Sequence, residues 1–185
     1  MQRKKSILFI GGSGLLALNW CLEIRDNYKV TLLMHRRKIS LKGVISDTLP
    51  LNSLDECLFA LDKHKPDIVI NAAGLTNIEE CEYNIDLAYE TNVNLVKNIA
   101  SACSNRVIKL IHISTDHLFS GNETFASEEL YTNPINNYAK TKLQGEQMVL
   151  DINKEAIIIR TNFFGWGLKY RESLSDYIIN KLRNN

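Results

Sequence analysis

Two tyrosine–lysine pairs have a spacing that places a phenol and an ammonium group on one face of a helix. They are Tyr138 with Lys142 and Tyr177 with Lys181. A phenol can protonate a carbonyl oxygen while hydride reaches the carbonyl carbon, and a nearby cation favours this by lowering a phenol pKa that is otherwise about 10. The spacing therefore indicates carbonyl reduction, and the sequence around each pair must decide between them.

The sequence before Tyr138 favours the first pair. An apolar run, Val107 to Ile113, ends at the hydroxyl side chains of Ser114 and Thr115, and a long irregular segment from about Asp116 to Asn133 leads to Tyr138. A hydroxyl at this point can position the carbonyl oxygen, with Ser114 as the alternative to Thr115. Tyr177 has no such partner and is assigned to packing. The predicted catalytic residues are Thr115, Tyr138 and Lys142.

A glycine-rich segment follows the first apolar run, Ile7 to Ile10, and opens a helical pattern. It reads Gly11-Gly12-Ser13-Gly14-Leu15-Leu16-Ala17, a GxxGxxA motif. Small residues let the backbone approach a pyrophosphate, and the N–H groups at a helix start stabilise its charge. We therefore assign Gly11, Gly14, Leu15 and Leu16 to cofactor binding. The alternative is a strand-to-helix turn that binds nothing.

Two further segments lie where a dinucleotide would extend. After the second apolar run the chain reads Met34-His35-Arg36-Arg37, where NAD-binding proteins usually have an acidic residue. Guanidinium groups favour a 2′-phosphate, so Arg36 and Arg37 predict NADP(H), with NAD(H) as the second choice and solvated loop charges as the alternative. The apolar run Ile68 to Ile70 is followed by the small residues Asn71, Ala72 and Ala73 before Gly74. These residues predict a cofactor contact, with a tight turn as the alternative.

The elements that must position these residues follow from hydrophobic patterning. Short apolar runs are continuous rather than alternating, as expected for strands covered on both faces of a parallel sheet. Segments with helical spacing separate them, and one row is expected to line a long helix. The runs are Ile7 to Ile10, Val30 to Leu33, Ile68 to Ile70, Val107 to Ile113 and Ala156 to Ile159, and the helical row is Leu87, Thr91, Leu95, Ile99 and Cys103. The fold class predicted is α/β, a doubly wound Rossmann-type sheet with ligands at the carboxyl ends of its strands.

Composition excludes several classes of function. Lys and Arg number 22 against 21 Asp and Glu, so the formal net charge of +1 gives no reason to expect nucleic acid as a partner. No run approaches the roughly 18 apolar residues of a membrane-spanning helix, and a cytoplasmic protein is expected. The cysteines and histidines lack metal-ligand spacing, so no metal is predicted and the thiols are read as reduced and structural. These residues are Cys21, Cys57, Cys81, Cys103, His35, His64, His112 and His117.

Taken in order, the motifs resemble those of the dTDP-4-dehydrorhamnose reductases within the extended short-chain dehydrogenase/reductases. They are GxxGxxA, Asn71 to Gly74, Ser114 to Gly121, Asn137 to Glu146 and Arg160 to Asn162. The resemblance implies that Thr115, Tyr138 and Lys142 form the catalytic set. It further implies that Tyr138 and Lys142 contact the cofactor, and that Thr76, Asp116 and Asn162 lie near the substrate. His117 stands where a tyrosine is usual in that family.

The resemblance implies an NAD(P)H-dependent reductase of a 4-keto nucleotide-sugar. Residues 1–170 are expected to form the cofactor-binding domain, and residues 171–185 the start of a substrate lobe that is largely absent. Epimerase or dehydratase chemistry, or a non-catalytic NADP-binding regulatory subunit, are the alternatives. The helices that flank the sheet are compatible with a homodimer.

Overall fold

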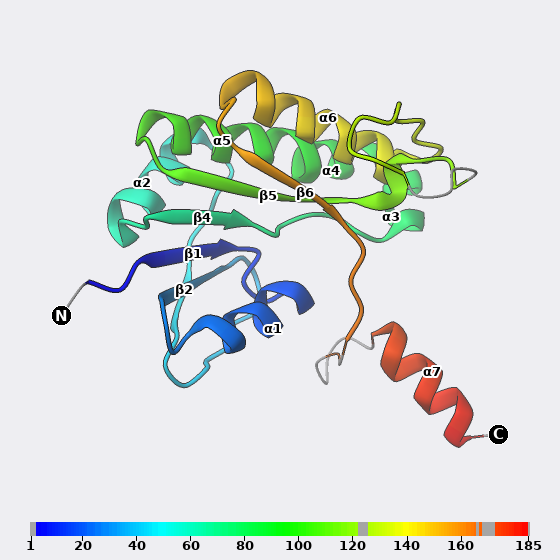
Figure 1. Cartoon of the computed structure of the whole chain (residues 1–185), viewed down its shortest axis with the longest axis horizontal. Helices are drawn as coiled ribbons and strands as arrows, with labels where there is room; N and C mark the ends of the chain where they lie inside the picture. The colour runs from blue at the N-terminus through cyan, green and yellow to red at the C-terminus, as the bar shows by residue number, and fades with distance from the viewer. Residues whose placement is uncertain (1–2, 122–125, 166, 168–172, 185) are drawn as a thin grey trace.

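A parallel sheet forms the centre of the molecule. The computed structural model describes residues 3–121, 126–165, 167 and 173–184. In this part of the chain the strand order is β3-β2-β1-β4-β5-β6, and all neighbours pair in parallel. This is the doubly wound Rossmann order, so the predicted fold class is confirmed (Figure 1). The strands are β1 Ser6–Ile10, β2 Lys29–Met34, β3 Ile45–Thr48, β4 Ile68–Asn71, β5 Lys109–Thr115 and β6 Ile157–Thr161.

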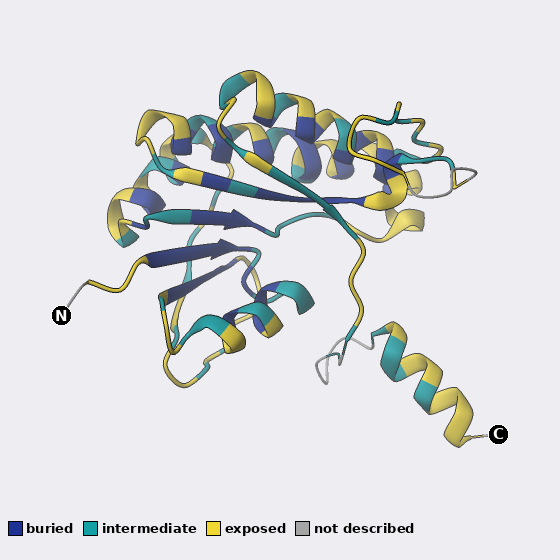
Figure 2. Ribbon diagram, in the orientation of Figure 1, coloured by how far each residue is buried: buried dark blue, intermediate teal, exposed yellow. Residues whose placement is uncertain are grey.

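Helices cover the two faces of the sheet. Helix α1 (Leu15–Ile24) packs on one face, where Phe9 and Leu32 are fully buried. Three helices pack on the other face, against Leu8 and Val69. They are α2 (Leu54–His64), α5 (Leu95–Asn105) and α6 (Asn137–Ile152). Figure 2 shows that the strands between these layers are mostly buried. Burial on both faces explains why the apolar runs are continuous.

The edge strand β3 was not predicted from the sequence. Strand β3 reads Ile45-Ser46-Asp47-Thr48 and pairs with β2 from Thr31 to Met34. It has a single strongly apolar residue, and none of its residues is buried. An edge strand pairs through its backbone on one side only, so its side chains carry no continuous hydrophobic signal. The other strands begin or end within two residues of the apolar runs.

The long helix expected around Leu87 is interrupted. Helix α4 (Ile85–Tyr89) continues into a π-helical segment, η1 (Glu90–Asn94), and then into α5. Leu87 is exposed, whereas Ala88 and Asn92 are buried. The predicted buried row that starts at Leu87 and continues every fourth residue is therefore wrong in its N-terminal half. The wider π turn changes which residues face the sheet, and Ile99 and Cys103 return to the buried row.

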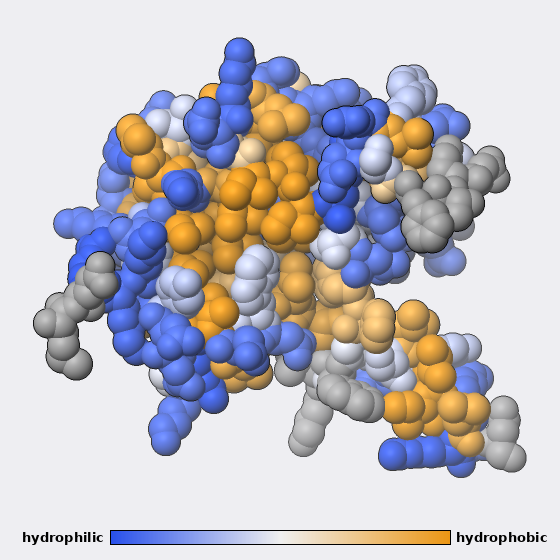
Figure 3. Space-filling view, in the orientation of Figure 1, coloured by the Kyte–Doolittle hydropathy of each residue, from blue (hydrophilic) through white to orange (hydrophobic). Residues whose placement is uncertain are grey.

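The last helix stands apart from the sheet layers. Helix α7 (Leu174–Arg183) starts with a capping box between Ser173 and Asp176 and has no buried residue. Apolar side chains gather along it and over the sheet (Figure 3). The expected domain boundary at residues 170 and 171 lies outside the described residues, as does Asn122 in the loop before α6. Within the described ranges, no helix is long and apolar enough to cross a membrane.

Candidate cofactor and catalytic site

The glycine turn lies at the point where the strand order reverses. Gly11 follows β1 with a φ of +80°, and a Cβ there would lie 2.7 Å from the Ala73 nitrogen. Chain segments leaving β1 and β4 therefore touch at this position, and only glycine permits both the left-handed backbone and the contact. Ligands of open α/β sheets bind at such a reversal, beyond the carboxyl ends of the strands.

The other predicted cofactor residues surround this turn. Gly14 precedes α1 and provides no side-chain cap, and Leu15 and Leu16 are the first, partly buried residues of the helix. The N–H groups of that first turn face a region suited to an anion. Arg36 and Arg37 follow the end of β2 and are exposed. The structure thus places all of these residues at one edge of the sheet.

Asn71 is held by its neighbours in the sheet. Its Oδ1 accepts a hydrogen bond from the Ala73 nitrogen at 3.1 Å, and its Nδ2 lies 3.1 Å from Nδ1 of His112. The residue is 1% exposed, whereas Ala72 and Ala73 are partly buried. Asn71 therefore shapes the turn after β4, and the backbone of Ala72 and Ala73 is the part of this segment that faces the glycine turn.

Thr115 and Tyr138 meet at the end of β5. Thr115 is the last residue of the strand, and its Oγ1 accepts from the His117 nitrogen at 3.2 Å. Asn136 caps α6 through the Ala139 nitrogen, which places Tyr138 in the first turn of the helix. The Thr115 side chain lies close enough to the Tyr138 phenol to lower its pKa. Ser114 is also buried, and its Oγ has no hydrogen-bond partner among the described atoms. The choice of Thr115 over Ser114 stays a prediction.

Burial changes the expected acidity of the Tyr138 phenol. Burial raises the pKa of Tyr138, and the nearby Thr115 side chain lowers it by a smaller amount. The sequence argument predicted a pKa lowered by Lys142, and this direction is wrong because burial dominates. The Lys142 ammonium donates to the Ile113 carbonyl, at 2.7 Å. A phenol that stays protonated at neutral pH is nevertheless suited to proton donation.

Lys142 is a buried cation. It is 4% exposed, and burial lowers its pKa to about 8, while the Glu146 carboxylate acts in the opposite direction. His112 lies nearby on β5, and burial together with Lys142 holds the pKa of its imidazole well below the usual value. A neutral His112 leaves Lys142 as the cation at this end of β5.

Asn92 is a site residue that the sequence analysis missed. Its fully buried side chain accepts from the Leu75 nitrogen at 2.9 Å and donates to Thr141 Oγ1 at 3.1 Å. It joins the segment after β4 to the helix that carries Tyr138 and Lys142. The available signal was a polar pair, Asn92 and Asn94, inside an otherwise apolar helical pattern. A polar residue in a buried helix needs hydrogen-bond partners, and here they come from distant segments.

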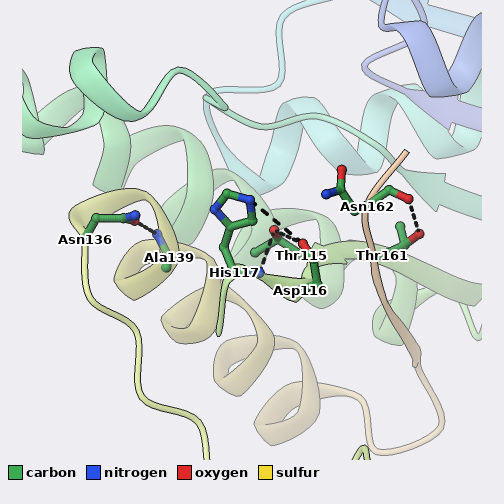
Figure 4. A network of polar contacts seen from close by, with 7 residues as sticks. All are labelled: Thr115, Asp116, His117, Asn136, Ala139, Thr161 and Asn162. Carbon is green, nitrogen blue, oxygen red and sulfur yellow. Dashed lines mark hydrogen bonds and ion pairs between the residues drawn. The ribbon is translucent and has the colours of Figure 1, made fainter. Parts of the chain in front are cut away.

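The predicted substrate residues lie on the open side of this site. Asp116 and Asn162 are exposed and follow neighbouring strands, since Thr115 pairs in register with Thr161 (Figure 4). Thr76 is exposed in the segment after β4. The His117 ring meets the Tyr138 ring edge to face, with centroids 5.9 Å apart. Of these residues, Asp116 and His117 lie close to Tyr138, and both can hydrogen-bond a polar ligand.

The second tyrosine–lysine pair is not part of this site. Tyr177 is 51% exposed on α7, and the Lys181 ammonium lies 5.7 Å from its ring centroid. Helix α7 has no buried residue, so the prediction that Tyr177 packs in the core is wrong. The four cysteines are free and buried, as predicted for structural thiols. Among the described residues, no group of three or more potential ligands could hold a metal ion.

The sheet order, the glycine turn at its reversal and the Thr115, Tyr138 and Lys142 arrangement beside β5 define a Rossmann domain of the short-chain dehydrogenase/reductase class. The chain belongs to the family described as the RmlD substrate binding domain, whose model matches residues 5–183. The family resemblance drawn from the motifs is thereby confirmed.

Individual relatives agree with this assignment. The chain is 29% identical over 158 residues to a dTDP-4-dehydrorhamnose reductase from Aggregatibacter actinomycetemcomitans, a match that covers 85% of this chain and 51% of that protein. It is 30% identical over 156 residues to a dTDP-4-keto-6-deoxy-D-glucose reductase from Streptomyces niveus, covering 83% and 51%. The chain thus spans about half the length of these relatives.

A solved structure shows the same fold. A dTDP-4-dehydrorhamnose reductase from Bacillus anthracis, in complex with NADP, superposes with a TM-score of 0.82 at 24% identity. The match covers 100% of this chain and 62% of that one.

Proposed function

We propose that this chain is the cofactor-binding and catalytic portion of an NADPH-dependent reductase that acts on a 4-keto nucleotide-sugar. The observation that carries the proposal is the convergence of the Thr115 hydroxyl, the Tyr138 phenol and the buried Lys142 ammonium at the end of β5. This end adjoins the strand-order reversal at Gly11.

The residues present fit a dinucleotide phosphate. Gly11 keeps the turn open where a side chain would collide with Ala73, and the first turn of α1 has no side-chain cap from Gly14. Backbone N–H groups at such a helix start hold a pyrophosphate. Arg36 and Arg37 are exposed after β2 and supply cations for a 2′-phosphate. NADPH is therefore preferred over NADH, and when bound it supplies the hydride.

The side chains of the chain itself manage the proton. Tyr138 stays protonated because its phenol is buried, and it donates to the oxygen of the keto group. The hydroxyl of Thr115, which lies near this phenol, orients the same oxygen. We assign Lys142, whose ammonium donates to the Ile113 carbonyl, to the nicotinamide ribose of the cofactor, as the family resemblance implies.

Relatives support the choice of substrate. The two reductases named above act, by their names, on dTDP-bound 4-keto sugars. The exposed Asp116, whose charge acts on the Tyr138 phenol, and the exposed Asn162 suit the hydroxyl groups of a sugar. We therefore assign a 4-keto nucleotide-sugar as the substrate class.

Consumption of NADPH by the full-length protein with a dTDP-4-keto-6-deoxy sugar tests the proposal. Turnover is expected in the wild type, and Tyr138→Phe should reduce kcat by about 100-fold or more while the NADPH Kd changes less than about threefold. Binding of NADPH without turnover would instead support a non-catalytic cofactor-binding subunit. Full activity in Tyr138→Phe would overturn the proton-donor assignment.

A further inference from the structure

A buried carboxylate lies between two cations next to the catalytic helix. Glu146 is 2% exposed and stands one helical turn after Lys142 in α6. Its carboxylate accepts from Arg160 Nη2 at 2.8 Å and from Arg160 Nε at 3.1 and 3.2 Å. It also raises the pKa of Lys142 through its charge. Glu146 therefore pairs with the guanidinium on β6, and its charge also acts on the ammonium one helical turn away.

Arg160 reaches a third segment as well. Its Nη1 donates to the Glu128 carbonyl at 3.2 Å, and its guanidinium carbon lies 5.7 Å from the centroid of the Phe119 ring. Phe119 directly follows η2 (Asp116–Leu118), which continues from Thr115. Arg160 itself pairs in register with Ser114. One side chain thus joins β6, helix α6 and the segment that carries the substrate-facing Asp116.

We propose that Arg160 is a positioning residue that acts through Glu146 to keep the Lys142 ammonium on the Ile113 carbonyl and to set its charge. This inference rests on the proposed function, because it assigns a task to a residue that touches neither of the reacting groups. Arg160 takes up most of the hydrogen-bonding capacity of Glu146. Without it, the buried carboxylate has Lys142 as its nearest cation and draws the ammonium towards itself.

The sign of each perturbation follows from the groups near Lys142. These are Glu146 and Tyr138 on α6, His112 on β5, Arg160 on β6 behind Glu146, and Asp116 and Cys81 on the Tyr138 side. Removing the charge of Arg160 eliminates a positive charge and frees Glu146, so Lys142 should hold its proton more strongly. Neutralising Glu146 removes the negative charge and has the opposite effect.

Titration of Lys142 in the full-length protein measures both effects without turnover. The protein is labelled with ¹⁵Nζ/¹³Cε-lysine, and the Lys142 signal is assigned by Lys142→Arg. Arg160→Gln should move the titration midpoint up by about one pH unit, and Glu146→Gln should move it down by a similar amount. Arg106→Gln, which breaks an exposed ion pair with Asp62, should leave the midpoint unchanged.

A merely structural role would not produce shifts of opposite sign. Equal midpoints in the two variants, or a shift in the same direction, would overturn the proposal. If Arg160→Gln does not fold, Arg160→Lys keeps the charge but loses the forked contact, so Glu146 is partly released and the Lys142 midpoint should lie at the wild-type value or above it by less than about one pH unit. A midpoint clearly below the wild type in Arg160→Lys would contradict the inference. In each variant the pH profile of kcat should move with the Lys142 midpoint. If the midpoints shift as expected but neither the wild type nor any variant turns over, the proposed reductase function is contradicted and the inference about Arg160 is not.

Discussion

At the scale of single residues, burial of the Lys142 charge lowers the free energy of unfolding, and this effect can be measured. Lys142 is almost fully buried and has a pKa of about 8, which means that its charged form is disfavoured in the folded protein. An unfolded lysine titrates near 10.4, so the unfolded chain binds more protons than the folded one between pH 8 and about 10.4. The free energy of unfolding should therefore rise with pH across this window, and below it the cost of the buried cation is fully present.

Lys142→Met should reveal this cost directly. At pH 7 the variant is expected to be more stable than the wild type by about 1 to 3 kcal/mol, because an apolar side chain replaces a buried charge. At pH 9.5 the difference should narrow, because Lys142 is then largely neutral in the folded wild type. Urea unfolding at the two pH values measures both. A difference that widens with pH would contradict the assigned pKa.

We propose that the arginines after β2 act on cofactor choice. Arg36→Ala/Arg37→Ala should weaken NADPH binding by about tenfold or more and leave NADH binding within about twofold, because the guanidinium groups contact the 2′-phosphate that NADH lacks. Fluorescence titration of the wild type and variant with both cofactors measures this. Lys97→Ala, an exposed cation on α5, serves as the control. Equal weakening for the two cofactors would remove the basis for NADP preference.

At the scale of elements, helix α6 is held by its contact with the π-helical segment. A Cβ on Gly145 would lie 2.3 Å from the carbonyl oxygen of Asn92, and both residues are buried. Backbone atoms cannot move aside as a flexible side chain can. The absence of a side chain at Gly145 therefore decides how closely the catalytic helix approaches η1.

Gly145→Ala should push the two segments apart. We expect a loss of stability of about 1 to 3 kcal/mol, despite the better helix propensity of alanine, because overpacking outweighs it. Activity should fall as well, since the Asn92 to Thr141 hydrogen bond spans the same contact. Thermal or urea unfolding measures the first effect, with Lys140→Ala on the exposed face of α6 as control. If Gly145→Ala were more stable than the wild type, helix α6 and η1 could move apart without cost, and the prediction would be wrong.

At the scale of the whole molecule, the sheet and its flanking helices form the stable unit. Helix α7 buries no residue, whereas the two larger hydrophobic clusters lie between the strands of the sheet and the helices that cover them. We propose that residues 1–170 fold as one domain. A chain ending at residue 170 should unfold at the same urea concentration as the 185-residue chain, within about 0.2 M, because the buried surface is unchanged. A clearly lower midpoint would show that α7 stabilises the sheet.

Much of this molecule follows from the sequence alone. Continuous apolar runs between helical segments determine a parallel α/β sheet, because strands covered on both faces have no polar side to reveal. The glycine motif, Thr115 and the Tyr138 to Lys142 spacing could be placed at strand ends because each depends on neighbours a few residues away. The edge strand β3 and the π turn escaped prediction, since neither has a hydrophobic period of its own.

Only the tertiary structure decides the properties that arise between distant segments. Asn92 meets Thr141 across 49 residues of chain, and no local pattern indicates that pairing. The burial of Lys142, the raised pKa of Tyr138 and the contact of Arg160 with Glu146 likewise depend on how α6 packs against β5 and β6. The sequence thus determines which chemical groups reach the site, whereas packing determines their charge and orientation, because both depend on the solvent that neighbouring segments exclude.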